Sequence, residues 1–153
     1  MLVKLYQLPD LTSNLYSIQQ KNITIRPALA PELHIVTAWV RQHFSLYWES
    51  ETYKAFANNP ITCYIAIDNG KLIGFACVEA TSKGFFGPTG VLESARGNGV
   101  GKCLLIYALH QLKNLGYAYA IIGGVGPKEF YAQHVGAVEI ADSTPGIYQG
   151  MLL

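Results

Sequence analysis

One short segment limits what this chain can fold into more than any other: Arg96-Gly97-Asn98-Gly99-Val100-Gly101-Lys102, in which glycine takes every second position from 97 to 101. It stands between a strand-like stretch, 84–92, and a long helical pattern, 99–115. The unpaired amides and the dipole at the start of a helix favour an anion, and glycine lets the backbone approach phosphate oxygens closely. The segment therefore predicts a phosphate-binding turn, to which Arg96 and Lys102 add positive charge.

Two other phosphate-binding patterns do not fit this segment. The nucleotide P-loop needs glycine five positions before Gly101 and Ser or Thr after Lys102, where the chain has Arg96 and Cys103. The dinucleotide fingerprint needs a glycine three positions after Gly99, and that position is Lys102. The pattern that remains is Arg-x-x-Gly-x-Gly.

The rest of the chain predicts an α+β fold with a mixed sheet. Asp68-Asn69-Gly70 suits a tight hairpin between two strands, and the strand-helix-strand order from 84 to 122 predicts a right-handed parallel unit. Glycine and proline within 84–92 indicate a bulge or a splayed end, and Gly116 suits the left-handed end of helix 99–115. Further strands are expected at 3–6, 23–25, 61–67, 71–79, 117–122, 137–141 and 146–152, and helices at 31–43, 50–57 and 127–134, with one irregular helix within 10–20.

Composition narrows the function. The chain has 153 residues, which suits one domain over 1–153, and its net charge of +1 lacks the basic excess that binds nucleic acid. No apolar run reaches the roughly 18 residues that span a bilayer, and the first residues lack a secretion signal. We therefore expect a soluble, cytoplasmic protein, as a monomer or homodimer, with no nucleic-acid or membrane partner.

Cysteine and histidine give no metal-site spacing, so no bound metal is expected. The cysteines lie in apolar segments and are interpreted as small buried hydrophobes, and the histidines as helix-surface residues. These residues are Cys63, Cys77, Cys103, His34, His43, His110 and His134.

The Arg-x-x-Gly-x-Gly pattern resembles the loop of the GNAT superfamily of N-acetyltransferases, which grips the coenzyme A (CoA) pyrophosphate. Residues 23–28, Ile-Thr-Ile-Arg-Pro-Ala, resemble that family's first strand, and residues 129–137 resemble its tyrosine-bearing helix. The resemblance covers residues 22–153, with 1–21 as an extra strand and helix. It implies a central, mostly antiparallel mixed sheet with helices on both faces, and acetyl-CoA as a co-substrate.

The resemblance also implies roles for particular residues. The amides of 97–102 would hold the pyrophosphate, the backbone of Val91 and Leu92 would pair with the pantetheine arm, and Tyr131 would protonate the departing thiolate. Gly124 stands where many members carry an Asn that bonds this arm, so only backbone contacts are expected there. Leu92-Glu93 replaces a polar-proline pair that is frequent before the loop.

An amine attacks a thioester only when neutral, so a proton acceptor is needed. We rank Glu79 first and Glu51 second, with Glu93 as a further candidate, although each also fits a surface carboxylate. Five aromatic residues and the turn 144–148 are candidates for the walls of an acceptor pocket, and core packing or a plain turn explains them as well. The aromatic residues are Phe44, Tyr47, Trp48, Phe85 and Phe86.

The predicted function is acetyl transfer from acetyl-CoA to a primary amine, most simply of a small molecule, by direct transfer in a ternary complex. Two alternatives stay open. One is a non-catalytic domain that binds acyl-CoA and regulates a partner, and the other is an interaction domain whose glycines are purely structural.

Overall fold

The structure is a computed structural model that describes residues 1–152; Leu153, the last residue of the expected domain, lies outside the described residues. Its centre is a six-stranded sheet in the order β1-β6-β5-β4-β3-β2. Only β5 and β6 pair in parallel, and the other neighbours are antiparallel. The strands are β1 Leu2–Lys4, β2 Ile23–Pro27, β3 Cys63–Asp68, β4 Lys71–Val78, β5 Phe85–Val91 and β6 Tyr119–Ile122.

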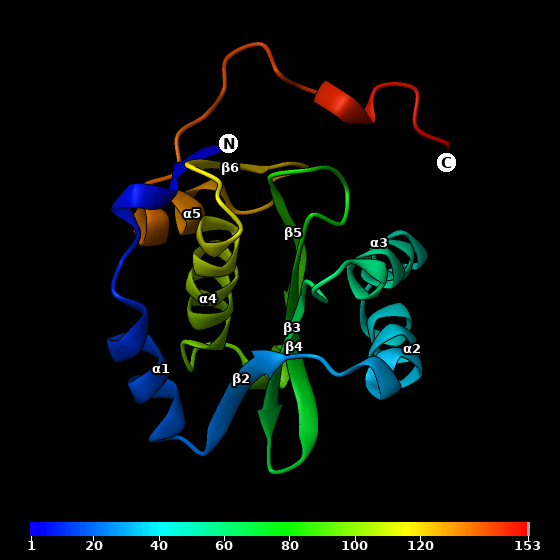
Figure 1. The fold of residues 1–153 in the computed structure, drawn as a ribbon, viewed down its shortest axis with the longest axis vertical. Coiled ribbons are helices and arrows are strands. Elements are labelled where there is room, and N and C mark those ends of the chain that lie inside the picture. The colour runs from blue at the N-terminus through cyan, green and yellow to red at the C-terminus, as the bar shows by residue number, and fades with distance from the viewer. Residues whose placement is uncertain (153) are drawn as a thin grey trace.

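Helices cover both faces of this sheet (Figure 1), which confirms the expected α+β fold. The long helix α4 (Val100–Asn114) packs on one face together with α1 (Leu11–Gln19) and α5 (Lys128–Val135). The pair α2 (Leu33–His43) and α3 (Leu46–Ala57) covers the other face. Two apolar cores result, because each face of the sheet buries the apolar stripe of its own helices. Short 3-10 turns occur at Leu5–Gln7, Ala30–Glu32, Glu93–Ala95 and Gly146–Tyr148.

The local signals in the sequence are confirmed where glycine or a cap sets the backbone. Asn69 and Gly70 have positive φ angles of 46° and 76° between β3 and β4, as a tight hairpin needs. Gly116 follows α4 with a φ of 100°. Helix α3 begins earlier than expected, because the Ser45 hydroxyl caps it by accepting a hydrogen bond from the Trp48 amide at 3.2 Å.

The expected closing strands 137–141 and 146–152 are wrong. Within these residues Val138 forms a single bridge to Leu2, and 146–148 is a 3-10 turn. The edge of β6 that faces away from β5 is paired with β1 instead, and Val3 of β1 is fully buried in the core. Pairing with β1 buries more apolar surface than the largely exposed C-terminal segment can, so β1 takes this edge.

The parallel pair β5 and β6 is confirmed, and it is short. Phe85 pairs with Ile121 and Phe86 with Ile122, but β5 continues to Val91 without a partner on this side. A register shift between Ala76 and Val78 marks a bulge in the neighbouring β4–β5 ladder. Beyond these two residue pairs, β5 and β6 therefore splay apart near the centre of the sheet. No helix among residues 1–152 is long and apolar enough to cross a membrane.

Candidate active site

The glycine segment forms the start of α4. Gly97 and Gly99 have positive φ angles of 78° and 82°, and the helix begins at Val100. Among residues 1–152, none of the main-chain amides from Gly97 to Lys102 donates a hydrogen bond to another protein group. Lys21, which follows α1, donates from Nζ to the Asn98 carbonyl at 2.8 Å and ties the segment in place. The result is a row of unused donors at the positive end of a helix dipole.

The splay between β5 and β6 exposes part of the β5 backbone. The Leu92 amide is already used, because it donates to the Ile73 carbonyl of β4 at 2.9 Å. Opposite residues of an antiparallel pair alternate between bonded and non-bonded, so Val91, which lies opposite Gly74, points its N–H and C=O away from β4. The Val91 carbonyl accepts a hydrogen bond from Arg96 Nε at 3.3 Å. Of the two residues predicted to meet pantetheine, only Val91 therefore offers an unused amide.

A cavity of about 690 Å³ lies at this splay. Tyr131 of α5 and Phe86 of β5 line one part, with ring centroids 6.2 Å apart, and Trp48 of α3 lines another. The Tyr131 ring is buried, whereas its hydroxyl makes no hydrogen bond to any residue from 1 to 152. Burial raises the pKa of Tyr131, which keeps this hydroxyl protonated and available as a proton donor.

Glu51 also lines this cavity, beside two residues that the sequence alone does not link to it. The Thr81 hydroxyl donates a hydrogen bond to the Glu51 carboxylate, and Tyr148 of the C-terminal turn completes the group. Burial raises the pKa of Tyr148; the neighbouring Thr81 hydroxyl opposes this increase and the charge of Glu51 adds to it. The turn 144–148 was a candidate wall, and Tyr148 lies in this wall. The group comes from three separate segments, so no local spacing could reveal it.

Glu79 has a different environment. Its carboxylate accepts hydrogen bonds from Lys83 Nζ at 2.9 Å and from the Tyr117 hydroxyl. Burial alone would raise the pKa of Glu79, but these two hydrogen bonds outweigh burial and lower it. Glu79 and Glu93 both lie outside the walls of the cavity. Of the candidate bases, only Glu51 therefore faces it.

Two glycines after β6 shape the cavity wall. A Cβ atom on Gly123 would lie 2.6 Å from the Tyr148 hydroxyl and 3.0 Å from Cε1 of Phe85, so only glycine lets Tyr148 pack there. Gly124 lines the cavity with a φ of 56°. Its missing side chain leaves backbone groups as the only contacts it can make. Among residues 1–152, no group of His, Cys, Asp or Glu is placed to hold a metal ion.

Comparison with solved structures finds the same fold in several acetyltransferases. A GCN5-related glucosamine N-acetyltransferase region of a fungal multi-domain β-N-acetylglucosaminidase matches with a TM-score of 0.70 and 16% identity, over 88% of this chain and 19% of that one. The GNAT-family N-acetyltransferase YhbS from Escherichia coli, in complex with CoA, matches with a TM-score of 0.59 and 21% identity, over 73% of this chain and 67% of that one. Rv2747 from Mycobacterium tuberculosis, also in complex with CoA, matches with a TM-score of 0.61 and 17% identity, over 76% of this chain and 72% of that one.

At identities of 16–21%, these structural similarities show the shared fold alone. This chain spans only about a fifth of the length of the fungal protein. A comparison with curated protein sequences found no match. The profile of the acetyltransferase (GNAT) family, by contrast, matches residues 30–136, most of the chain, and this range contains the glycine segment, the splayed strands and Tyr131. The chain therefore belongs to the acetyltransferase (GNAT) family.

Proposed function

We propose that this protein is an N-acetyltransferase that moves the acetyl group of acetyl-CoA to the primary amine of a small-molecule acceptor, by direct transfer in a ternary complex. One observation carries the proposal. The unused amides at the start of α4 and the free Tyr131 hydroxyl lie on the same face of the sheet, with the splay between β5 and β6 beside them.

The residues at the start of α4 fit the diphosphate of CoA. A Cβ atom on Gly97 would meet no protein atom within 4 Å, so the space beside this residue is open to a ligand. The amides from Gly97 to Lys102 would hold the pyrophosphate, and the free amide of Val91 would pair with the pantetheine arm. Gly124 adds backbone contacts only. Bound there, acetyl-CoA supplies the thioester whose acetyl group is transferred.

Tyr131 and Glu51 divide the proton transfers between them. The amine nitrogen forms a bond to the thioester carbonyl carbon, and the bond from that carbon to sulfur breaks. Glu51 accepts the first proton that the ammonium of the acceptor must lose, directly or through water, and Tyr131 gives its proton to the departing sulfur. The nitrogen loses its second proton as the carbon–sulfur bond breaks, and this proton restores Tyr131, directly or through water. We favour Glu51 over Glu79 as the base, because Glu51 faces the cavity and Glu79 is engaged by Lys83 and Tyr117.

The rate enhancement beyond these proton transfers comes from holding the amine, the thioester and Glu51 in place. The hydrogen bond from Thr81 holds the Glu51 carboxylate, and the rings of Trp48 and Tyr148 restrict how an amine can lie. Holding the amine and the thioester together converts an encounter between two molecules into a reaction within one complex.

The decisive experiment is Tyr131→Phe, assayed against a panel of primary amines with a free-thiol readout. The rate constant kcat should fall about 10²- to 10⁴-fold, as expected for loss of a general acid. Stability should be preserved, because the hydroxyl has no protein partner.

The wild-type protein and Tyr131→Phe should both bind acetyl-CoA. Acetyl-CoA at about 100 times its Kd should stabilise each by roughly 2.7 kcal/mol in melting curves. An unchanged kcat in Tyr131→Phe would remove Tyr131 from the mechanism. A wild-type protein whose melting curve does not respond to acetyl-CoA would refute the proposal as a whole. Binding without turnover for any amine would favour a regulatory acyl-CoA-binding domain instead.

A further inference from the structure

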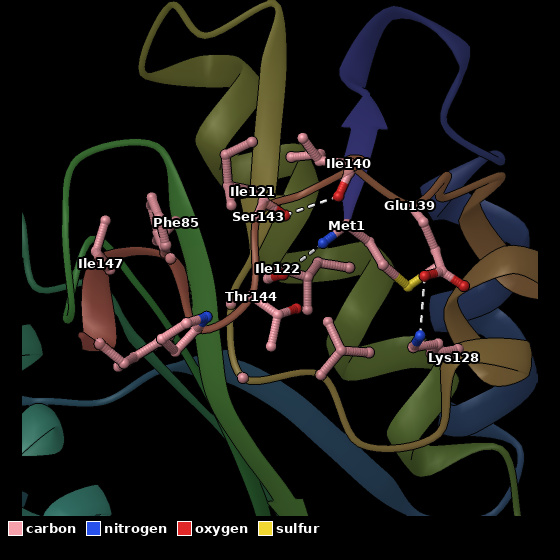
Figure 2. A pocket seen from close by; sticks show the side chains of 16 residues that line it. Met1, Phe85, Ile121, Ile122, Lys128, Glu139, Ile140, Ser143, Thr144 and Ile147 are labelled. Carbon is pink, nitrogen blue, oxygen red and sulfur yellow. Dashed lines mark hydrogen bonds and ion pairs between the residues drawn. The ribbon is translucent and has the colours of Figure 1, made fainter.

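Beside the active site lies a second cavity of about 740 Å³ (Figure 2). We propose that it holds the uncharged, apolar body of the acceptor, so that the preferred acceptors are monoamines with an aliphatic or aromatic tail. This inference rests on the acetyl-transfer function proposed above. It names the class of acceptor that the same site would select.

The second cavity shares a wall with the active-site cavity. Ile122, Gly123, Gly124, Ile147 and Tyr148 line both. An amine whose nitrogen lies near Glu51 can therefore extend past Tyr148 into the second cavity within one continuous ligand. The Tyr148 hydroxyl and Phe85 fill the space beside Gly123, so the route runs past Gly124, where an added Cβ would lie 3.9 Å from the nearest Tyr148 atoms.

The second cavity lies at the end of β5 and β6, where both faces of the sheet contribute to its walls: Phe85 and Ile121 from one face and Ile122 from the other. Successive side chains of a strand point to opposite faces. Phe86 packs with Tyr131 on the face covered by α4, whereas Phe85 points to the other face and into the second cavity (Figure 2). Helix α3, which carries Glu51, covers this same face. The Phe85 side of the second cavity therefore adjoins the face on which the amine would lie, and we assign the cavity to the acceptor on this ground.

The walls favour an uncharged ligand. The two charged side chains among them, Lys128 and Glu139, pair with each other at 2.8 Å. The ammonium group of Met1 also lines the cavity and donates to the Ile122 carbonyl at 2.7 Å, so the walls present no free negative charge to a ligand. Ile140 and Ile147 line the cavity with 39% and 57% of their surface exposed, and they gain from apolar cover. A second cation on the acceptor would lose its water there and find no free carboxylate.

A series of primary n-alkylamines from ethylamine to hexylamine tests the inference. The KM of the amine should fall about two- to fourfold per methylene, while the KM of acetyl-CoA stays constant. Hexylamine should have a kcat/KM at least tenfold higher than 1,6-diaminohexane, which has the same length and a second charge. Broadening of hexylamine NMR signals by the protein alone measures the same binding without turnover.

A charge placed in the second cavity should reverse this preference. In Ile140→Glu the ratio of kcat/KM for hexylamine over 1,6-diaminohexane should fall at least tenfold, because the new carboxylate repels the tail and attracts the second ammonium. Ile140 lines only the second cavity. Leu115→Glu is the matched control, since Leu115 is 41% exposed and lies outside both cavities. Melting curves of both variants establish that each is folded.

The outcomes separate this inference from the proposed function. If no amine is acetylated, the transferase function fails. If amines are acetylated but KM is independent of chain length, or if the preference survives in Ile140→Glu, the inference about the acceptor is overturned. The rate could instead depend on the length of the acyl group of the thioester and not on the length of the amine. That result would assign the second cavity to the acyl chain and would also overturn the inference about the acceptor.

Discussion

Gly97→Ala separates the phosphate-binding role of the glycine segment from its role in folding. Gly97 has a φ of 78°, and an added Cβ would meet no protein atom within 4 Å. The variant therefore costs only the strain of a left-handed alanine, about 1 kcal/mol, which lowers the Tm by about 2–4 °C for a chain of this size. Gly70 in the β3–β4 hairpin has a φ of 76° and equally open surroundings, so Gly70→Ala should show the same loss.

The two variants should differ sharply in CoA binding. At Gly97 the new methyl group projects into the space proposed for the pyrophosphate and lengthens at least one charge-assisted hydrogen bond, which is worth about 1.5–3 kcal/mol. The Kd for CoA should therefore rise about 10- to 100-fold, while Gly70→Ala should bind like the wild-type protein. Titration calorimetry measures both constants. Equal Kd values for the two variants would refute the reasoning that this amide row holds the diphosphate.

Two further predictions concern the stability of the fold outside the two cavities. Two hydrogen bonds from Arg26, helped by the Leu29 amide, lower the pKa of Glu32 to about 2; Glu32→Gln should therefore cost about 2 kcal/mol at pH 7, after allowing for solvent screening of this partly exposed pair. The pKa of Glu32 is lower in the folded state than its unfolded value near 4.5. The stability difference between wild type and Glu32→Gln should therefore be fully present above pH 4.5 and vanish as the pH falls toward 2. A difference in urea midpoints that stays constant with pH would contradict the role of the Arg26–Glu32 pair. Gly90→Ala places a Cβ 2.4 Å from Cζ of Phe44 and should cost about 1–3 kcal/mol. Adding Phe44→Leu should cost less in that background than in the wild-type protein, and additive losses in denaturant titrations would exclude the contact as the cause.

The features that the sequence predicts correctly are those set by one or two residues. Asn69 and Gly70 determine the hairpin through their tolerance of positive φ, and Gly116 ends α4 in the same way. The turn before α4 is equally local, because Gly97 and Gly99 adopt the left-handed conformation that few other residues accept. Family, fold class and the parallel β5–β6 unit follow from these signals and their order along the chain.

The tertiary structure alone decided which strand pairs with β6 and which carboxylate faces the cavity. Both β1 and residues 137–152 are plausible partners by pattern, and only the buried apolar area of each, with Val3 fully enclosed, selects β1. Glu79 follows a strand and Glu51 lies on a helix, and nothing in either local sequence shows which carboxylate faces the cavity. Their difference lies in Thr81, Tyr117 and other neighbours distant along the chain. Short-range preferences depend on one residue's backbone and can be recognised in the sequence, whereas burial and hydrogen-bond partners depend on the position of every other segment.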